Sequence, residues 1–347
     1  MSVDRPISRR RLLLVSGGAA AMLGMRGTSW VAAQEATPTP TLGWSDDFSD
    51  NGLLNVATTV APISSIVRNI GGDRINLHGV VPDGTNSHTF EPAPSDAVIL
   101  SQADVLIANG LDLEDPTIEM ANENLPDGAA VFTLGDKTIT PEEYAYDFSF
   151  PEEDGHPNPH LWTNVPFAIA YAELITDELS RLDPDNADYF SGNLERYRAA
   201  LESLDTAIHA TVASIPEENR RLLTYHDSWA YFAPNYGMTV IGAIQPSDFS
   251  EPSPRDVADL IDQIREENVP AIFGSEVFPS DVLEQIASET GAVYVDDLRD
   301  DEPPGDPNAP EHTYIGMMKR NLQIMADALG GDSSLMESVE TGDTWAA

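Results

Sequence analysis

Short β-branched runs and segments with helical spacing alternate along the chain from residue 53 onward. The strand-like runs lie at 54–60, 74–81, 104–109 and 130–134. The helical segments between them lie at 61–70, 94–102 and 113–123. Strand–helix alternation at this spacing is typical of βαβ units and predicts a mostly parallel sheet.

The alternation stops at an acidic, aromatic and proline-containing segment, 138–158, which we predict to be a long loop. A helical segment follows at 165–182, and then 186–214 runs with almost no helix breaker. The apolar residues of 186–214 are spaced by three and four positions, which predicts one amphipathic helix about 43 Å long.

Alternation resumes after this helix. We predict strands at 221–225, 238–243, 271–274 and 292–295. We predict helices at 228–235, 254–267, 279–290 and 314–329. The expected fold is therefore α/β, with two lobes, each a mostly parallel sheet flanked by helices, joined by one long rigid helix.

The first 33 residues are typical of an export signal and are not expected to belong to the fold. Arg9, Arg10 and Arg11 precede a leucine run, and Val31-Ala32-Ala33 offers a small-residue cleavage site. The paired arginines favour the twin-arginine route. The Pro/Thr-rich residues after them predict a disordered tether.

These patterns divide the chain into six predicted parts. The signal is 1–33, the tether 34–52, the first lobe 53–185, the linking helix 186–215, the second lobe 216–331 and a loose tail 332–347.

Composition narrows the possible partners and the location. The chain has 58 acidic and 18 basic residues, and a formal net charge of −40 disfavours binding to nucleic acid or to anionic lipid. Its cysteine count is 0, which excludes thiolate ligands and disulfides. We therefore expect an extracytoplasmic protein, periplasmic or at the cell surface. We do not expect a lipoprotein: the protein is either free or held by an uncleaved signal.

The sequence contains 7 histidines, and three of them lie where a strand passes into a loop or helix. His88 follows the strand that ends at Val81, His160 lies in Asn158-Pro-His-Leu-Trp162, and His226 ends the first strand of the second lobe. Open α/β sheets place ligand-binding groups at such strand ends.

Five ordered segments resemble the zinc/manganese-binding solute-binding proteins of ABC importers, the family that includes the metal-binding adhesion lipoproteins. These segments are 80–96, 103–114, 158–162, 225–232 and 312–321, and the resemblance covers about 55–329. It implies a protein without enzymatic activity that captures a metal ion and delivers it to a permease. We expect a monomer.

The resemblance also implies the metal ligands. The first three fall on His88, His160 and His226, and the fourth, an aspartate at the end of the last strand, on Asp296, with Asp297 as the alternative in register. Imidazole ligands suit Zn²⁺, and added carboxylate shifts a site toward Mn²⁺, so Zn²⁺ is the expected ion and Mn²⁺ the second choice.

Further polar residues are candidates for outer hydrogen bonds or alternative ligands. Glu276 follows the strand 271–274, Asp227 adjoins His226, and His156 precedes the second ligand. Two other functions fit a metal site: a secreted zinc hydrolase, with Glu276 as its base, and a surface adhesin stabilised by metal. Neither a His-Glu-x-x-His motif nor an open coordination position supports the hydrolase.

Overall fold

The computed structural model describes residues 48, 51–245, 252–275 and 281–346, and it confirms the predicted α/β fold with two parallel sheets. The predicted signal and nearly all of the predicted tether lie outside these residues. In the first sheet the strand order is β2-β1-β3-β4, and every pairing is parallel. Its strands are β1 (Leu54–Thr58), β2 (Ile75–Gly79), β3 (Val105–Ala108) and β4 (Ala130–Thr133).

The second sheet repeats this topology with the order β6-β5-β7-β8, again with parallel pairing. Its strands are β5 (Arg221–Thr224), β6 (Thr239–Ala243), β7 (Ala271–Ser275) and β8 (Val293–Leu298). Because the strands of a parallel sheet all point the same way, their carboxyl ends gather at one edge.

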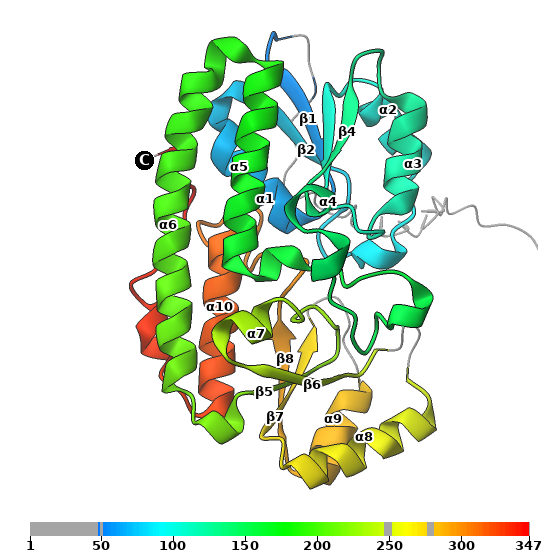
Figure 1. Cartoon of the computed structure of the whole chain (residues 1–347), viewed down its shortest axis with the longest axis vertical. Helices are drawn as coiled ribbons and strands as arrows, with labels where there is room; N and C mark the ends of the chain where they lie inside the picture. The colour runs from blue at the N-terminus through cyan, green and yellow to red at the C-terminus, as the bar shows by residue number, and fades with distance from the viewer. Residues whose placement is uncertain (1–47, 49–50, 246–251, 276–280, 347) are drawn as a thin grey trace, which may run out of the picture. The chain divides into compact units, whose positions relative to one another are not determined.

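Helices connect and cover the strands (Figure 1). The first lobe carries α1 (Ala61–Gly71), α2 (Pro94–Leu100), α3 (Asp115–Asn124), the short α4 (Gly135–Thr138) and α5 (Val165–Leu182). The second carries α7 (Phe232–Tyr236), α8 (Pro254–Glu267), α9 (Asp281–Thr290) and α10 (Tyr314–Leu329). Local sequence sets their ends: Ser253 and Asp256 form a reciprocal capping box at α8, and Gly330 ends α10 in the left-handed conformation at φ 81°.

The predicted long helix is α6 (Ala187–Ser214), with 28 residues. It packs against α5, α1 and α10, beside which it runs in Figure 1. Its buried face includes Tyr197, Leu201, Leu204 and Ile208, which follow the predicted spacing. At 1.5 Å per residue its length is about 42 Å.

One hydrophobic core cluster extends through both lobes. It joins residues of α1, α5, α6, α7 and α10 to residues of both sheets, and its largest buried side chains include Trp162, Tyr171, Tyr197, Trp229 and Tyr314. The two lobes therefore share their largest core, to which α6 contributes, and each lobe also has a smaller hydrophobic cluster of its own.

The prediction of a loose tail over 332–347 is wrong for the residues that the structure describes. A 3₁₀ turn, η8 (Ser333–Met336), packs against α10 and α6, and Met336 and Val339 are buried. Farther on, Asp343 forms an ion pair with Arg68 of α1 at 3.2 Å. Buried apolar side chains, this ion pair and the hydrogen bonds of Thr344 to Asn69 together hold this acidic, polar segment on the core.

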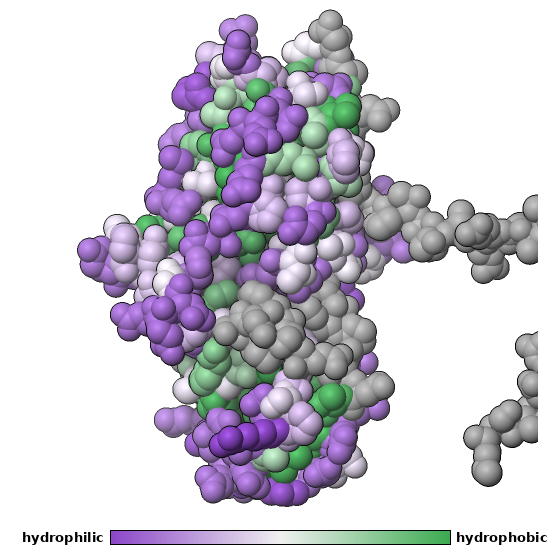
Figure 2. All heavy atoms as spheres, turned by 90° about the vertical axis from the view of Figure 1, so that its right-hand side faces the viewer, coloured by the Kyte–Doolittle hydropathy of each residue, from purple (hydrophilic) through white to green (hydrophobic). Residues whose placement is uncertain are grey.

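The described surface agrees with the acidic composition. The face shown in Figure 2 carries mostly hydrophilic side chains with smaller apolar areas between them. Among the described helices, none combines the length and the apolar character needed to cross a membrane.

Candidate metal site

The structure brings three of the predicted ligand residues together at one point. His88 lies in a 3₁₀ turn, η2 (Ser87–Thr89), His160 directly precedes η5 (Leu161–Thr163), and His226 lies two residues beyond β5. The Nε2 atom of His88 is 3.1 Å from that of His160 and 3.2 Å from that of His226, and the last two are 2.9 Å apart. In a tetrahedral zinc site with bonds of about 2.0–2.1 Å, donor atoms are about 3.3–3.4 Å apart, so this triangle is close to the size a metal requires.

Two of the rings are oriented by amide oxygens behind them. Nδ1 of His160 is 2.8 Å from Oδ1 of Asn158, and Nδ1 of His226 is 2.8 Å from Oε1 of Gln245. Because an amide oxygen only accepts hydrogen bonds, each Nδ1 carries the proton and each Nε2 presents its lone pair. Lone pairs that converge at these distances repel one another unless a cation lies between them.

Burial favours the neutral form of the His88 and His160 rings. Burial, together with the neighbouring His226, lowers the pKa of His88 well below its ordinary value, and burial acts in the same direction on the pKa of His160. Neutral imidazole is the form that binds metal. The arrangement therefore offers the correct protonation state at neutral pH.

Two buried aspartates, Asp300 and Asp301, lie beside this triangle. Oδ2 of Asp300 is 3.4 Å from Nε2 of His226. One ligand atom each of His160, Asp300 and Asp301 lie within 4.8 Å of one another. Burial raises the pKa of both carboxyls, and for Asp300 the charge of Asp301 adds to the effect. A divalent cation would offset the cost of burying these charges.

The structure does not bring the predicted fourth ligand, Asp296, or its alternative Asp297 to the histidines. Asp296 is exposed, and Asp297 pairs with Arg299 at 2.8 Å and with Arg320 at 3.4 Å. The predicted strand ends at Val295, whereas β8 continues to Leu298. The strand therefore ends just before a second Asp-Asp pair, Asp300-Asp301, which lies four residues after the predicted pair Asp296-Asp297.

The three accessory candidates have different outcomes. Asp227 is buried, and its Oδ2 accepts a hydrogen bond from the backbone amide of Ser149 at 2.8 Å. The hydrogen-bond partner of the His226 ring is instead Gln245, which the sequence analysis did not predict. His156 is exposed and pairs with Asp112, at 2.9 Å between Nδ1 and Oδ2. Glu276 lies outside the described residues.

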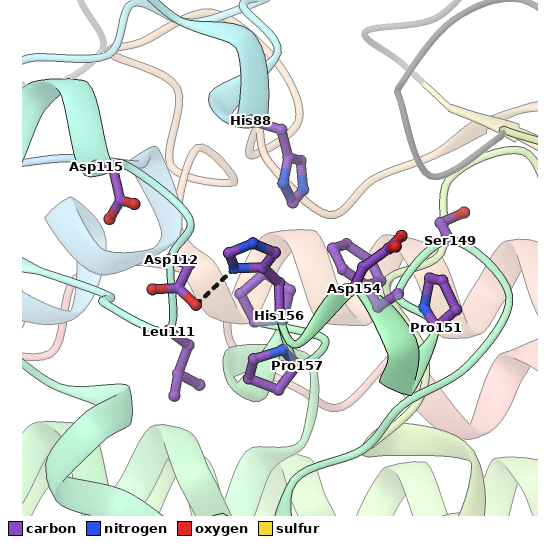
Figure 3. A pocket seen from close by; sticks show the side chains of 11 residues that line it. His88, Leu111, Asp112, Asp115, Ser149, Pro151, Asp154, His156 and Pro157 are labelled. Atoms are coloured by element: carbon purple, nitrogen blue, oxygen red, sulfur yellow. Dashed lines mark hydrogen bonds and ion pairs between the residues drawn. The ribbon is translucent and has the colours of Figure 1, made fainter.

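An acidic pocket lies next to the histidine triangle (Figure 3). His88 and His156 project into it from different segments, and Asp112, Asp115 and Asp154 contribute carboxylates to its lining. Since His88 belongs to both the pocket and the triangle, this pocket gives a cation a negatively charged path to the half-buried ring.

Hydrogen bonds across the lobes hold the site together. Nδ2 of Asn158 donates to the backbone oxygen of Asp227 at 2.7 Å, while its Oδ1 holds His160. Nε1 of Trp162 donates to the backbone oxygen of Asp300 at 2.8 Å. Residues at or next to His160 in the first lobe thus position the backbone beside His226 and at Asp300 in the second.

Comparisons with known proteins point to metal-binding proteins. The family model described as zinc-uptake complex component A, periplasmic, matches residues 56–328. A manganese-binding lipoprotein, MntA, of Halalkalibacterium halodurans is 30% identical over 280 residues, which cover 81% of this chain and 90% of the relative. The manganese ABC transporter substrate-binding lipoprotein PsaA of Streptococcus pneumoniae is 28% identical over 81% of this chain and 90% of its own length.

Solved structures agree in fold. The periplasmic zinc-binding protein TroA of Treponema pallidum has a TM-score of 0.73 and 28% identity, and the match covers 80% of this chain and 99% of TroA. A manganese-bound periplasmic metal-binding protein of Candidatus Liberibacter asiaticus has a TM-score of 0.70 and 27% identity, with the same two coverages.

The relatives correct one prediction and decide the family. They support the extracytoplasmic location, but MntA and PsaA are named lipoproteins, which contradicts our expectation that the protein is not one; we withdraw that expectation. The protein is a metal-binding substrate-binding protein of an ABC transporter, and such proteins are not enzymes. The family model covers most of the chain, and the chain therefore belongs to the family of the periplasmic component A of zinc-uptake complexes.

Proposed function

We propose that the protein captures Zn²⁺ with His88, His160, His226 and Asp300 and delivers it to the permease of its ABC importer. The observation that carries this proposal is the triangle of three Nε2 atoms, each within 3.2 Å of the other two. The fixed tautomers of His160 and His226 aim two lone pairs at its centre. Asp300 replaces Asp296 as the fourth ligand.

The choice of Zn²⁺ follows from the donors. Three imidazole nitrogens and one carboxylate oxygen complete a tetrahedral shell, which Zn²⁺ favours. TroA is named for zinc, whereas MntA and PsaA are named for manganese, so Mn²⁺ is the second cargo to test. Export by the twin-arginine signal in residues 1–33 belongs to the same proposal.

Capture and release require no chemical step. His88 and His160 belong to the first lobe, and His226 and Asp300 to the second, so a bound ion links the lobes, and the permease must move the ligands of one lobe away from those of the other to release it. Four protein donors leave no open position for an activated water, which disfavours a zinc hydrolase. The continuous hydrophobic core disfavours an adhesin whose folding depends on metal.

Metal analysis and competition titration of the full chain test the proposal. We expect about one Zn²⁺ per chain and a loss of affinity above about 100-fold in His226→Ala, because loss of a mere outer-shell partner already costs about 10–100-fold. His209→Ala is the matched control, since His209 is an exposed residue of α6. An unchanged Zn²⁺ affinity in His226→Ala would refute the site.

The same titration distinguishes the two Asp-Asp pairs. We expect Asp300→Asn to weaken Zn²⁺ binding by at least about tenfold and Asp296→Asn to leave it unchanged. The opposite order would restore Asp296 as the ligand and would mean that β8 is displaced in the metal-bound protein.

A further inference from the structure

Asp301 is a second buried carboxylate at the metal site that the four-ligand set does not use. Its residue is only 6% exposed, and the neighbouring Asp300 is 2% exposed. One of its oxygens belongs to the group with His160 and Asp300 in which all ligand atoms lie within 4.8 Å. A buried carboxylate beside another carboxylate is costly, so its position requires a reason.

A hydrogen bond from the other lobe fixes Asp301. Oγ of Ser87 donates to Oδ2 of Asp301 at 3.0 Å, and Ser87 directly precedes the ligand His88. A carboxylate has two oxygens and about four lone-pair positions, so one oxygen can accept from Ser87 while lone pairs remain for a cation. Asp301 is therefore held in place beside the site by the segment that also supplies His88.

The number of donors determines which ions gain from Asp301. Three histidines and Asp300 already saturate a four-coordinate Zn²⁺ ion. Mn²⁺ favours carboxylate oxygen and reaches higher, near-octahedral coordination, so a fifth donor adds to its binding. An added carboxylate therefore shifts the preference of the site toward Mn²⁺, which imidazole ligands alone do not do.

We propose that Asp301 is a fifth donor that selects for Mn²⁺ and allows this site to hold Mn²⁺ as well as Zn²⁺. The inference rests on the proposed function, because it concerns the same site. Asp301 contributes little to the affinity for Zn²⁺, and it supplies an additional oxygen ligand when the bound ion is Mn²⁺.

The test compares both metals on the full chain. In competition titrations with MnCl₂ and ZnCl₂, we expect Asp301→Asn to lower Mn²⁺ affinity at least about tenfold more than Zn²⁺ affinity. Asp297→Asn is the control, because Asp297 is bound to Arg299 and Arg320 and lies away from the histidines. The electron paramagnetic resonance spectrum of bound Mn²⁺ should change in Asp301→Asn and stay unchanged in the control.

Two further variants separate direct coordination from support. Ser87→Ala removes the hydrogen bond but retains the carboxylate, so Mn²⁺ selectivity should fall less than in Asp301→Asn; an equal fall would overturn direct coordination. If Asp301→Asn does not fold, as judged by its thermal melt without metal, Asp301→Glu keeps the charge and moves the oxygen. A parallel change for both metals in Asp301→Glu would overturn the proposal.

The outcomes separate this inference from the function itself. Wild-type protein that binds neither metal would refute the proposed function. Wild-type protein that binds both, with an Mn²⁺/Zn²⁺ affinity ratio unchanged in Asp301→Asn, would refute only the role of Asp301.

Discussion

At the scale of single residues, Asn158 contributes to the site through both ends of its amide. Its oxygen accepts from Nδ1 and from the backbone amide of His160, and its nitrogen donates to the backbone oxygen of Asp227. One side chain therefore fixes the tautomer of a ligand in the first lobe and binds the backbone next to a ligand in the second. Asn158 belongs to the segment 158–162 that the sequence analysis noted, but its role was not predictable, because its partner in the second lobe is brought near only by the fold.

Replacing Asn158 should weaken metal binding without removing a ligand. We expect Asn158→Ala to lower Zn²⁺ affinity by about 10–100-fold, because the His160 ring loses the acceptor that orients it. Competition titration measures the effect, with Asn124→Ala as the control, since the Asn124 amide donates to the backbone oxygen of Met120 within α3. Equal affinity in Asn158→Ala and wild type would show that Asn158 does not position His160.

Glu114 is a second buried residue with an informative environment, near the acidic pocket. Oε1 accepts from Thr59 and from the amide of Asn109, and Oε2 accepts from the amide of Gly110. Despite these donors, burial raises the pKa of Glu114 from 4.5 to about 7. A raised pKa in the folded state means that the folded protein holds this proton more tightly than the unfolded chain does.

This pKa predicts a specific pH dependence of stability. The contribution of Glu114 is fully present below about pH 4.5 and is lost as pH rises through about 7, a change of about 3 kcal/mol. The side chain in Glu114→Gln cannot ionise. From pH 4.5 to 8, wild type should therefore lose about 3 kcal/mol of unfolding free energy relative to this variant. Urea unfolding at both pH values measures it, and a constant difference would contradict the assignment.

The cluster of three histidines was predictable from sequence, whereas the aspartate that lies beside it was not. His88, His160 and His226 stand in separate motifs at the ends of predicted elements, where a parallel sheet gathers ligand groups. The aspartate depended on the length of one strand, and the sequence Asp296-Asp-Leu-Arg-Asp-Asp301 offers the same pair at two positions. Strand ends are the least certain part of a prediction, because tertiary pairing extends or shortens them.

At the scale of elements, regular periodicity predicted α6 and the strands. The packing of the C-terminal segment could not be predicted, because its composition is mostly polar. The segment after Gly330 is polar and acidic, but Met336 and Val339 are buried against the core. Lys319 of α10 donates to the backbone oxygens of Glu337 and Val339. The two buried positions, Met336 and Val339, are too few to give a periodicity, so only the folded surface that receives them shows their role.

Adjacent residues in η8 test this packing. Met336 is fully buried and Leu335 is 39% exposed, so we expect Met336→Ala to destabilise the protein by about 2–5 kcal/mol and Leu335→Ala by less than about 0.5 kcal/mol. Urea unfolding of the two variants checks the contrast. Equal small effects would mean that the C-terminal segment detaches in solution.

At the scale of the whole molecule, the common core limits how the lobes can move. The core cluster joins α1, α5 and α10 to both sheets along α6. A wide opening between the lobes would expose this apolar surface to water, at a cost of about 25 cal/mol per Å². Metal exchange through rearrangement of the loops that carry His88, His160 and Asp300 avoids that cost.

The core and the site together predict how metal affects unfolding. Without metal the protein should unfold in one cooperative transition, because the largest hydrophobic core cluster is shared by both lobes. Zn²⁺ at 100 times its Kd should add about 2.7 kcal/mol and raise the Tm, because the ion binds only the folded site. Calorimetry with and without Zn²⁺ measures both, and His226→Ala should keep the single transition but lose the rise in Tm. Two separate transitions in the metal-free protein would contradict the common core. A metal-free protein that is already unfolded at 25 °C would show that the ion is a structural component and not a cargo.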